Sequence, residues 1–186
     1  MIPRRILLGL TCAMFGCLEV KTEYELIHDG NAVDIDPFPG PYFEKDGEGF
    51  IPIEVTKLAK QGHYKLTRNQ EETIEVRTCQ IDDNYFLVQF TDNDEEGIYF
   101  DIYPCKIHGG SIYYLEIADD ELSDKVQAEI AAAIPRKRGE HHSNESSVAD
   151  NLLKAYKAIV IDHLADAVEK KIYYSQDEVQ ALKGKR

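Results

Sequence analysis

Seven short segments between residues 41 and 118 constrain the fold more than any other feature of the chain. They are rich in Ile, Val, Tyr and Phe, a composition typical of β-strands, and they span residues 41–45, 49–58, 63–67, 73–81, 85–91, 98–107 and 111–118. The polar breaks between them are short. Parallel neighbours need crossovers of about a dozen residues or more, so the breaks predict antiparallel hairpins.

The residues after this region favour helices. Acidic residues open a segment over 119–134 that Pro135 stops. Ser147 and Asp150 resemble a capping box, and apolar residues at helical spacing predict a long amphipathic helix over 147–171. Ser175 and Glu178 open a short last helix. We therefore expect an α+β fold: an antiparallel, strongly bent or barrel-like sheet of about seven strands, covered on one face or edge by C-terminal α-helices.

The residues before the sheet carry two further signals. Residues 22–27 form a candidate strand, and Pro37, Pro39 and Pro41 then exclude regular pairing. An ordered loop or linker is expected here. At the start of the chain, Arg4 and Arg5 precede an uncharged run over residues 6–16, which is the layout of a secretory signal and is too short for a membrane-spanning helix.

The end of that run, Met14-Phe15-Gly16-Cys17, resembles the lipobox of bacterial lipoproteins. The resemblance covers only the first part of the chain, and it implies cleavage before Cys17, lipidation of Cys17 and, with Leu18 following, a location on the periplasmic side of the outer membrane. Two or more acyl chains would give stable anchoring. The alternatives are an ordinary signal peptide of a soluble periplasmic or secreted protein, or a retained apolar first strand.

This reading divides the chain into four parts. Residues 1–16 are the signal peptide, 17–40 the lipidated segment and proline-rich linker, 41–118 the antiparallel β domain, and 119–186 a helical region packing on that domain. Cys79 and Cys105 are then the remaining thiols, and an oxidising compartment suggests a disulfide. However, a sequential meander separates their strands by about 10 Å, beyond the roughly 7 Å limit for a bridge. The pair is therefore bonded only if a bend before each cysteine or a different strand order joins them.

The charge distribution excludes one class of partner. Residues 18–134 contain 9 Lys and Arg against 26 Asp and Glu, and such an acidic surface repels nucleic acid. It would attract a cationic envelope protein. Tyr99, Tyr103, Tyr113 and Tyr114 crowd two neighbouring strands and form a candidate interaction surface, because Tyr is enriched at interfaces. Packing between the strands is the alternative.

No catalytic, cofactor or metal site is expected from the sequence. Nucleophile motifs, phosphate-binding loops and metal-ligand spacings are missing. The leading hypothesis is thus a non-catalytic, lipid-anchored cell-envelope protein that binds a protein or an envelope component. The alternatives are a small-ligand-binding β-barrel carrier and a hydrolase with a site of dispersed carboxylates. A closed barrel with a cavity of several hundred Å³ would favour the carrier.

The anchoring hypothesis predicts the effect of Cys17→Ser. The variant should lose acylation and move from the membrane fraction to the soluble fraction, because the thioether cannot form on serine. Incorporation of labelled palmitate measures this directly, with Cys12→Ser as the matched control. Equal labelling of wild type and Cys17→Ser would contradict the hypothesis.

Overall fold

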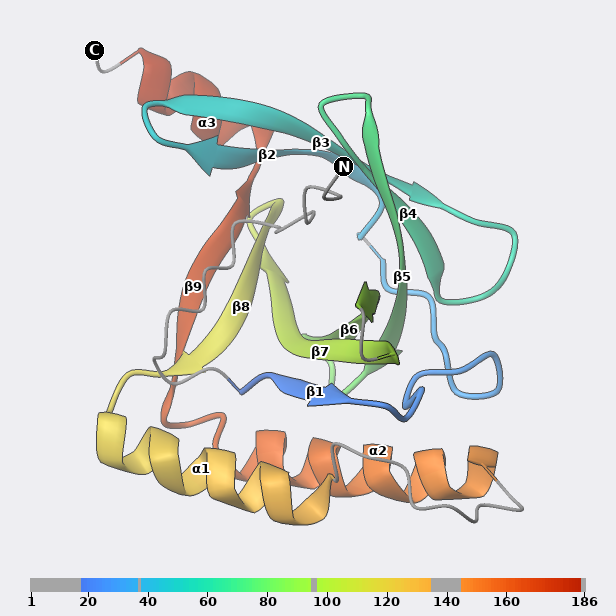
Figure 1. Ribbon diagram of the computed structural model, residues 1–186. Coiled ribbons are helices and arrows are strands. Elements are labelled where there is room, and N and C mark those ends of the chain that lie inside the picture. The colour runs from blue at the N-terminus through green and yellow to red at the C-terminus, as the bar shows by residue number, and fades with distance from the viewer. Residues whose placement is uncertain (1–17, 37, 95–96, 135–144, 185–186) are drawn as a thin grey trace.

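The computed structural model shows an α+β protein built on a closed antiparallel barrel of eight strands (Figure 1). The structure describes residues 18–36, 38–94, 97–134 and 145–184. The barrel strands are β2 (Gly40–Asp46), β3 (Gly49–Lys57), β4 (His63–Arg68), β5 (Glu72–Gln80), β6 (Tyr85–Asp94), β7 (Gly97–His108), β8 (Ser111–Ile117) and β9 (Ala167–Tyr174). An extra strand, β1 (Val20–Thr22), pairs with β7. The predicted fold class is confirmed.

The barrel is a meander that its last strand closes. Strands β2 to β8 pair in sequence order, as the short breaks predicted. Strand β9 then pairs with β8 over most of its length and with β2 at only two positions, Phe43↔Tyr174 and Glu44↔Tyr173. Both open edges of the meander are thereby satisfied, which removes the unpaired backbone groups of edge strands.

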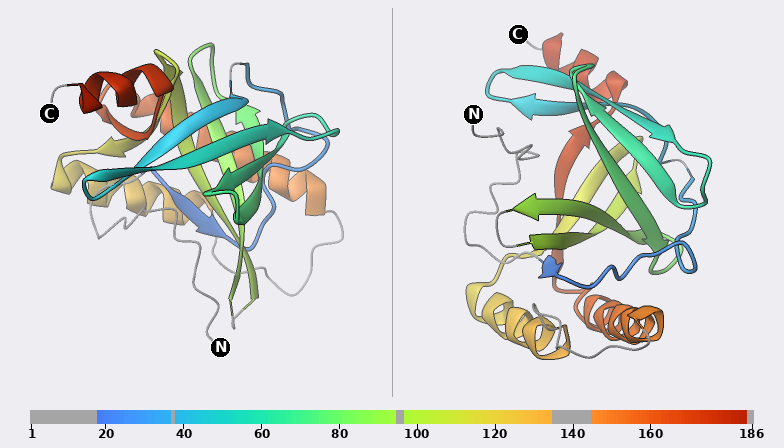
Figure 2. Two further views of the ribbon diagram at one scale, coloured as in Figure 1. Left: turned by 90° about the horizontal axis from the view of Figure 1, so that it is seen from above. Right: turned by 45° about the vertical axis from the view of Figure 1, so that its right-hand side comes forward.

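Three helices lie on two opposite sides of the barrel. Helices α1 (Asp120–Ala133) and α2 (Glu145–Asp162) lie side by side beneath β1, and α3 (Gln176–Lys183) lies near β2 at the opposite end (Figures 1 and 2). Ser175 and Glu178 form the expected capping box of α3. Asp119 caps α1 through its side chain, which accepts a hydrogen bond from the amide of Leu122.

The long helix predicted over 147–171 is wrong in its last nine residues. Helix α2 ends at Asp162, and residues 167–174 form the closing strand. Helical spacing of the apolar residues continues past the end of α2 through Leu164 and Ala167. Pairing with β8 overrides this local pattern, because it satisfies a whole row of backbone donors and acceptors that would otherwise stay open.

The strand predicted at residues 22–27 is also wrong for most of its length, since β1 covers only Val20–Thr22. The residues that follow are held without regular pairing. The Gln89 side-chain amide accepts from the amide of Ile27 at 2.8 Å and donates to its carbonyl at 2.9 Å. Further along, the hydroxyl of Tyr42 donates to the carbonyl of Phe38 at 3.0 Å, and Phe38 is buried.

Two apolar clusters lie on opposite faces of the sheet. One fills part of the barrel and contains, among others, Val76, Phe86 and Cys105. The other joins the outer face of the barrel to the helices and contains Cys79, Ile102 and Tyr156. Strands β5 and β7 contribute to both clusters, so the buried face of each strand changes along its length.

This change of face occurs over the three-residue step from Val76 to Cys79 in β5 and from Ile102 to Cys105 in β7. The predicted bends before Cys79 and Cys105 do not interrupt pairing, because the registers of β5–β6 and β6–β7 are continuous there. Val76 faces the barrel and Cys79 the helices, whereas Ile102 faces the helices and Cys105 the barrel. A three-residue step along a strand changes the face of the sheet. The step therefore marks a strand with two buried faces.

Tyr156 joins α2 to the barrel by hydrogen bonds, and its substitution should lower the free energy of unfolding. Its side chain is fully buried, and its hydroxyl donates to the carbonyl of Leu18, with the carbonyl of Ile102 at 3.3 Å. Tyr156→Phe leaves a buried carbonyl without its donor and should lower the free energy of unfolding by about 1–3 kcal/mol. Urea denaturation measures this.

Tyr174→Phe is the matched control, because the Tyr174 side chain is only half-buried. It should change the free energy of unfolding by less than about 0.5 kcal/mol. An equal loss in both variants would show that the hydroxyl of Tyr156 does not hold the helix to the sheet.

Candidate functional site

The barrel encloses a cavity of about 360 Å³ that opens to solvent on one side. Strands β2, β4, β6, β7, β8 and β9 supply most of its lining, so it exists only because the barrel is closed. Most of the uncharged lining is aromatic or aliphatic. Its aromatic members are Phe38, Phe90, Tyr103, Tyr114, Tyr173 and Tyr174. A barrel of eight strands is just wide enough for side chains to fill or for one small ligand.

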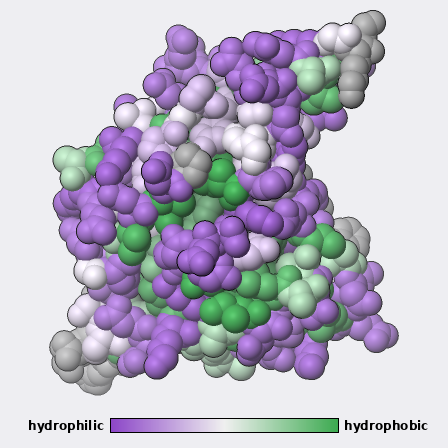
Figure 3. Space-filling model, turned by 180° about the vertical axis from the view of Figure 1, so that it is seen from behind, coloured by the Kyte–Doolittle hydropathy of each residue, from purple (hydrophilic) through white to green (hydrophobic). Residues whose placement is uncertain are grey.

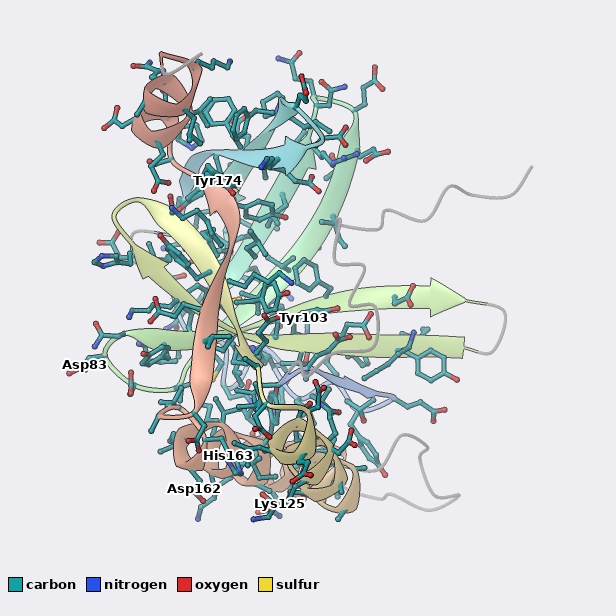
Figure 4. The ribbon with its side chains drawn as sticks, turned by 90° about the vertical axis from the view of Figure 1, so that its left-hand side faces the viewer. Asp83, Tyr103, Lys125, Asp162, His163 and Tyr174 are labelled. Carbon is teal, nitrogen blue, oxygen red and sulfur yellow. The ribbon has the colours of Figure 1, made fainter. Side chains whose placement is uncertain are left out.

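Alternation along the strands positions this lining. In β6, Phe86, Val88 and Phe90 face inward, and in β7 Tyr103 and Cys105 do the same. Figure 4 shows Tyr103 to the right of β9 at about mid-height, and Tyr174 near the end of β9 that leads to α3. Because successive side chains of a strand point to opposite faces of the sheet, every second residue of these strands contributes to the cavity wall.

Polar groups meet the cavity at the seam between β2 and β9. Glu44 is largely buried and accepts a hydrogen bond from Nε of Arg68 at 2.8 Å. A guanidinium nitrogen of Arg68 also lies 3.2 Å from Glu72. The side chains of Glu44 and Glu72 thus share one cation, and Arg68 has a raised pKa because Glu44 stabilises its charged form.

Tyr173 stands opposite Glu44 in the same seam. Its side chain is 4% exposed and lines the cavity, and its hydroxyl has no hydrogen-bond partner among the described residues. Burial, and then the charge of Glu44, raise the pKa of Tyr173 above its usual value of 10.0. The residue therefore keeps a neutral hydroxyl that can both donate and accept.

A second polar group lies where β1 meets β7. The hydroxyl of Tyr103 donates to Glu19 at 3.1 Å. Burial is the largest influence on the Glu19 carboxyl, and the charge of Asp101 adds to it; together they raise its pKa above 4.5 despite the opposing effects of Tyr103 and Lys21. Among the acidic side chains that the structure describes, Glu19 is one whose pKa is raised by its surroundings.

A third group lies between β8 and β9. The hydroxyl of Tyr114 donates to Glu116 at 3.1 Å, and the ammonium group of Lys170 lies 3.5 Å from the same carboxylate. Lys170 also stands over the ring of Tyr114, at 5.6 Å from its centroid. The neighbouring Lys171 is paired with Glu178 of α3.

The two cysteines are free and lie in different surroundings. Cys105 lines the cavity, and burial raises the pKa of its thiol. Cys79 faces the helices, where Nζ of Lys157 lies 2.9 Å from its sulfur. The disulfide considered from the sequence is therefore not formed, because the thiols point to opposite faces of a sheet whose intervening strand keeps them apart. Cys17 lies outside the described residues.

The four tyrosines of the candidate interaction surface are divided between two environments. Tyr103 and Tyr114 line the cavity. Tyr99 is 8% exposed beneath the ammonium group of Lys21, and Tyr113 is half-buried beneath that of Lys171. They do not form one exposed patch. Apolar residues do gather on another face of the molecule, where hydrophilic residues frame them (Figure 3).

Three histidines of the described residues, His28, His63 and His163, each contact a different carboxylate. His28 contacts Asp150 at 3.0 Å, His63 contacts Asp29 at 3.0 Å, and His163, near the end of α2 in Figure 4, contacts Glu129 at 3.1 Å. Across residues 18–184, outside the gaps given above, no group of three potential ligands is placed to hold a metal ion. His141 and His142 lie outside the described residues.

Sequence reasoning missed the residues that complete the site. Glu44 belongs to the predicted strand 41–45, whereas Arg68 lies just after the predicted strand 63–67, and nothing in their local pattern shows that they meet. Tyr173 was left between the predicted helix over 147–171 and the last short helix, and no strand was expected there. The run Ile172-Tyr173-Tyr174, β-branched and aromatic, is the signal that could have identified a strand there.

The chain matches no protein-family model, no curated protein and no solved structure. Helices α1, α2 and α3 are each too short or too polar to cross a bilayer, and this holds for every helix in the described part of the chain. The geometry of the cavity is therefore the basis for assigning a function.

The raised pKa of Glu19 predicts a pH-dependent effect of Glu19→Gln. The pKa of Glu19 is higher in the folded than in the unfolded protein. The free energy of unfolding of wild type therefore falls as the pH rises from 4.5 through the pKa of Glu19 in the folded protein. Glutamine has no such titration. The variant should therefore gain stability relative to wild type between about pH 4 and about pH 7.

Urea denaturation across this pH range measures the difference. Glu75→Gln removes one carboxylate at an exposed position of β5 and is the control. A Glu19→Gln difference that is constant or shrinks toward neutral pH would contradict the inferred direction.

Proposed function

We propose that the protein binds one small, largely apolar molecule inside its barrel. The observation that carries the proposal is the aromatic cavity of about 360 Å³ within a closed eight-stranded barrel. Ligand pockets are usually concave and mostly apolar, with a few polar groups that fix orientation. The Tyr173 hydroxyl and the Glu44–Arg68 pair are such groups.

The ligand-binding role is preferred over the leading hypothesis drawn from the sequence, in which the protein binds another protein or an envelope component. Two of the four tyrosines that suggested an interaction surface line the cavity instead. The hydrolase alternative has less support, because Glu44 and Glu116 are each engaged by a cation. Among the described residues, Glu19, with its raised pKa, is the acid that favours it.

A lipid anchor on Cys17 and an envelope location remain part of the proposal. The support for them is the sequence of residues 1–17. An anchored barrel of this kind would hold or pass on an apolar molecule that diffuses poorly through water, and the acidic surface would keep the protein soluble beside the membrane.

The test uses aminoanthracene, a neutral probe that fluoresces more strongly in apolar surroundings. Titration of the full chain should give saturable binding with one site per molecule. Val88→Phe adds a ring inside the cavity, because Val88 is 3% exposed and lines the wall. It should weaken binding at least tenfold.

Val33→Phe makes the same change at a position that is 36% exposed and outside the cavity lining, and it should leave the affinity within twofold. Leu66→Phe provides a second filling variant if Val88→Phe does not fold. Unchanged affinity in folded Val88→Phe and Leu66→Phe, or no saturable binding to wild type, would refute the proposed function.

A further inference from the structure

The charged groups around the cavity define which ligands suit it. Arg68 is shared by Glu44 and Glu72, so its positive charge is already more than balanced. Lys170 is balanced by Glu116, and Lys171 by Glu178. Lys45 remains, and it is an exposed side chain at the margin of the lining.

A charged group buried inside the barrel would therefore have no buried partner of opposite charge left to it, because Lys45 is exposed to solvent. Burying an ion costs far more than a hydrogen bond returns unless an opposite charge compensates it. An anion would face Glu44 beside an already neutralised Arg68. A cation would have to displace Arg68 or Lys170 from its carboxylate. The lining favours a neutral molecule over either ion.

One group of the lining is still available for hydrogen bonding. The hydroxyl of Tyr173 is buried without a partner among the described residues, and a buried polar group in that state costs free energy until it is satisfied. A tyrosine hydroxyl is protonated at neutral pH, and burial raises the pKa of Tyr173 further. It can thus donate to a carbonyl or ether oxygen of a ligand.

The cavity also sets the size of the ligand. A cavity of about 150 Å³ holds benzene, with its six carbons. By proportion, about 360 Å³ holds about 14 non-hydrogen atoms, the size of two or three fused or linked rings.

We propose that the ligand is a neutral aromatic or alicyclic molecule of two or three rings, which places a single carbonyl or ether oxygen against the hydroxyl of Tyr173. This inference rests on the proposed function, and it adds the chemical class of the ligand and the residue that selects it. Tyr173 orients the molecule, while the aromatic walls supply most of the affinity.

Three molecules that share the naphthalene ring system separate the contributions of the carbonyl group, the apolar rings and a negative charge to binding. Acetylnaphthalene carries a carbonyl, ethylnaphthalene has none, and naphthoate replaces it with a charge. Isothermal titration of the full chain should give acetylnaphthalene an affinity about five- to tenfold higher than that of ethylnaphthalene. Naphthoate should bind at least tenfold more weakly than acetylnaphthalene.

Tyr173→Phe removes the hydroxyl and keeps the ring. It should bring the affinities of acetylnaphthalene and ethylnaphthalene to within twofold of each other, with ethylnaphthalene bound as well as by wild type or better. Tyr174→Phe, which changes the adjacent lining residue, should keep the preference for acetylnaphthalene. Aromatic-ring NMR signals of Phe90 and Tyr103 should shift on binding and so locate the ligand.

The outcomes distinguish the two proposals. If the three molecules bind and Tyr173→Phe keeps the wild-type ratio, or if naphthoate binds most tightly, the ligand class is wrong and the binding function stands. If none binds and aminoanthracene also fails to bind, both proposals are overturned. Loss of folding in Tyr173→Phe is avoided by Tyr173→Met, which likewise removes the hydroxyl and should show the same change of ratio.

Discussion

The pairing of β9 with both β8 and β2 is the constraint on which the rest of the structure depends. A meander of seven strands has two open edges, and each carries unpaired backbone groups. Strand β9 satisfies both, and it brings Tyr173 opposite Glu44. The seam with β2 contains only two residue pairs, yet it converts a bent sheet into a barrel and gives the cavity one of its walls.

Local patterns in the sequence predicted the seven strands from β2 to β8, because short polar breaks and β-branched residues act within a few residues of each other. They did not predict β9. Leu164 and Ala167 continue the helical spacing of α2, and only a partner strand some fifty residues earlier decides that the segment is extended. For the same reason the sequence predicted only part of the candidate site. It identified Tyr103 and Tyr114, but as residues of an interaction surface. The contact of Glu44 with Arg68 could be predicted only from the strand register.

Two buried faces on the same strands explain why the sheet is so rich in apolar residues. The inner face lines the cavity and the outer face packs on α1 and α2. A strand with one solvent-exposed face would alternate regularly between apolar and polar residues, and β5 and β7 do not. In each of them the buried residues change from one face of the sheet to the other just before Cys79 and Cys105. The charges follow the same division, since the acids at the cavity are paired with cations and most others lie on the surface.

The position of β9 in the chain has a consequence for biogenesis. Closure requires residues 167–174, which follow β2 by more than a hundred positions and are synthesised after both long helices. Until they emerge, β2 and β8 present open edges, and contacts that span so much chain form slowly. Open strand edges are templates for pairing with other chains, so a chain that ends before β9 is expected to expose an aggregation-prone sheet.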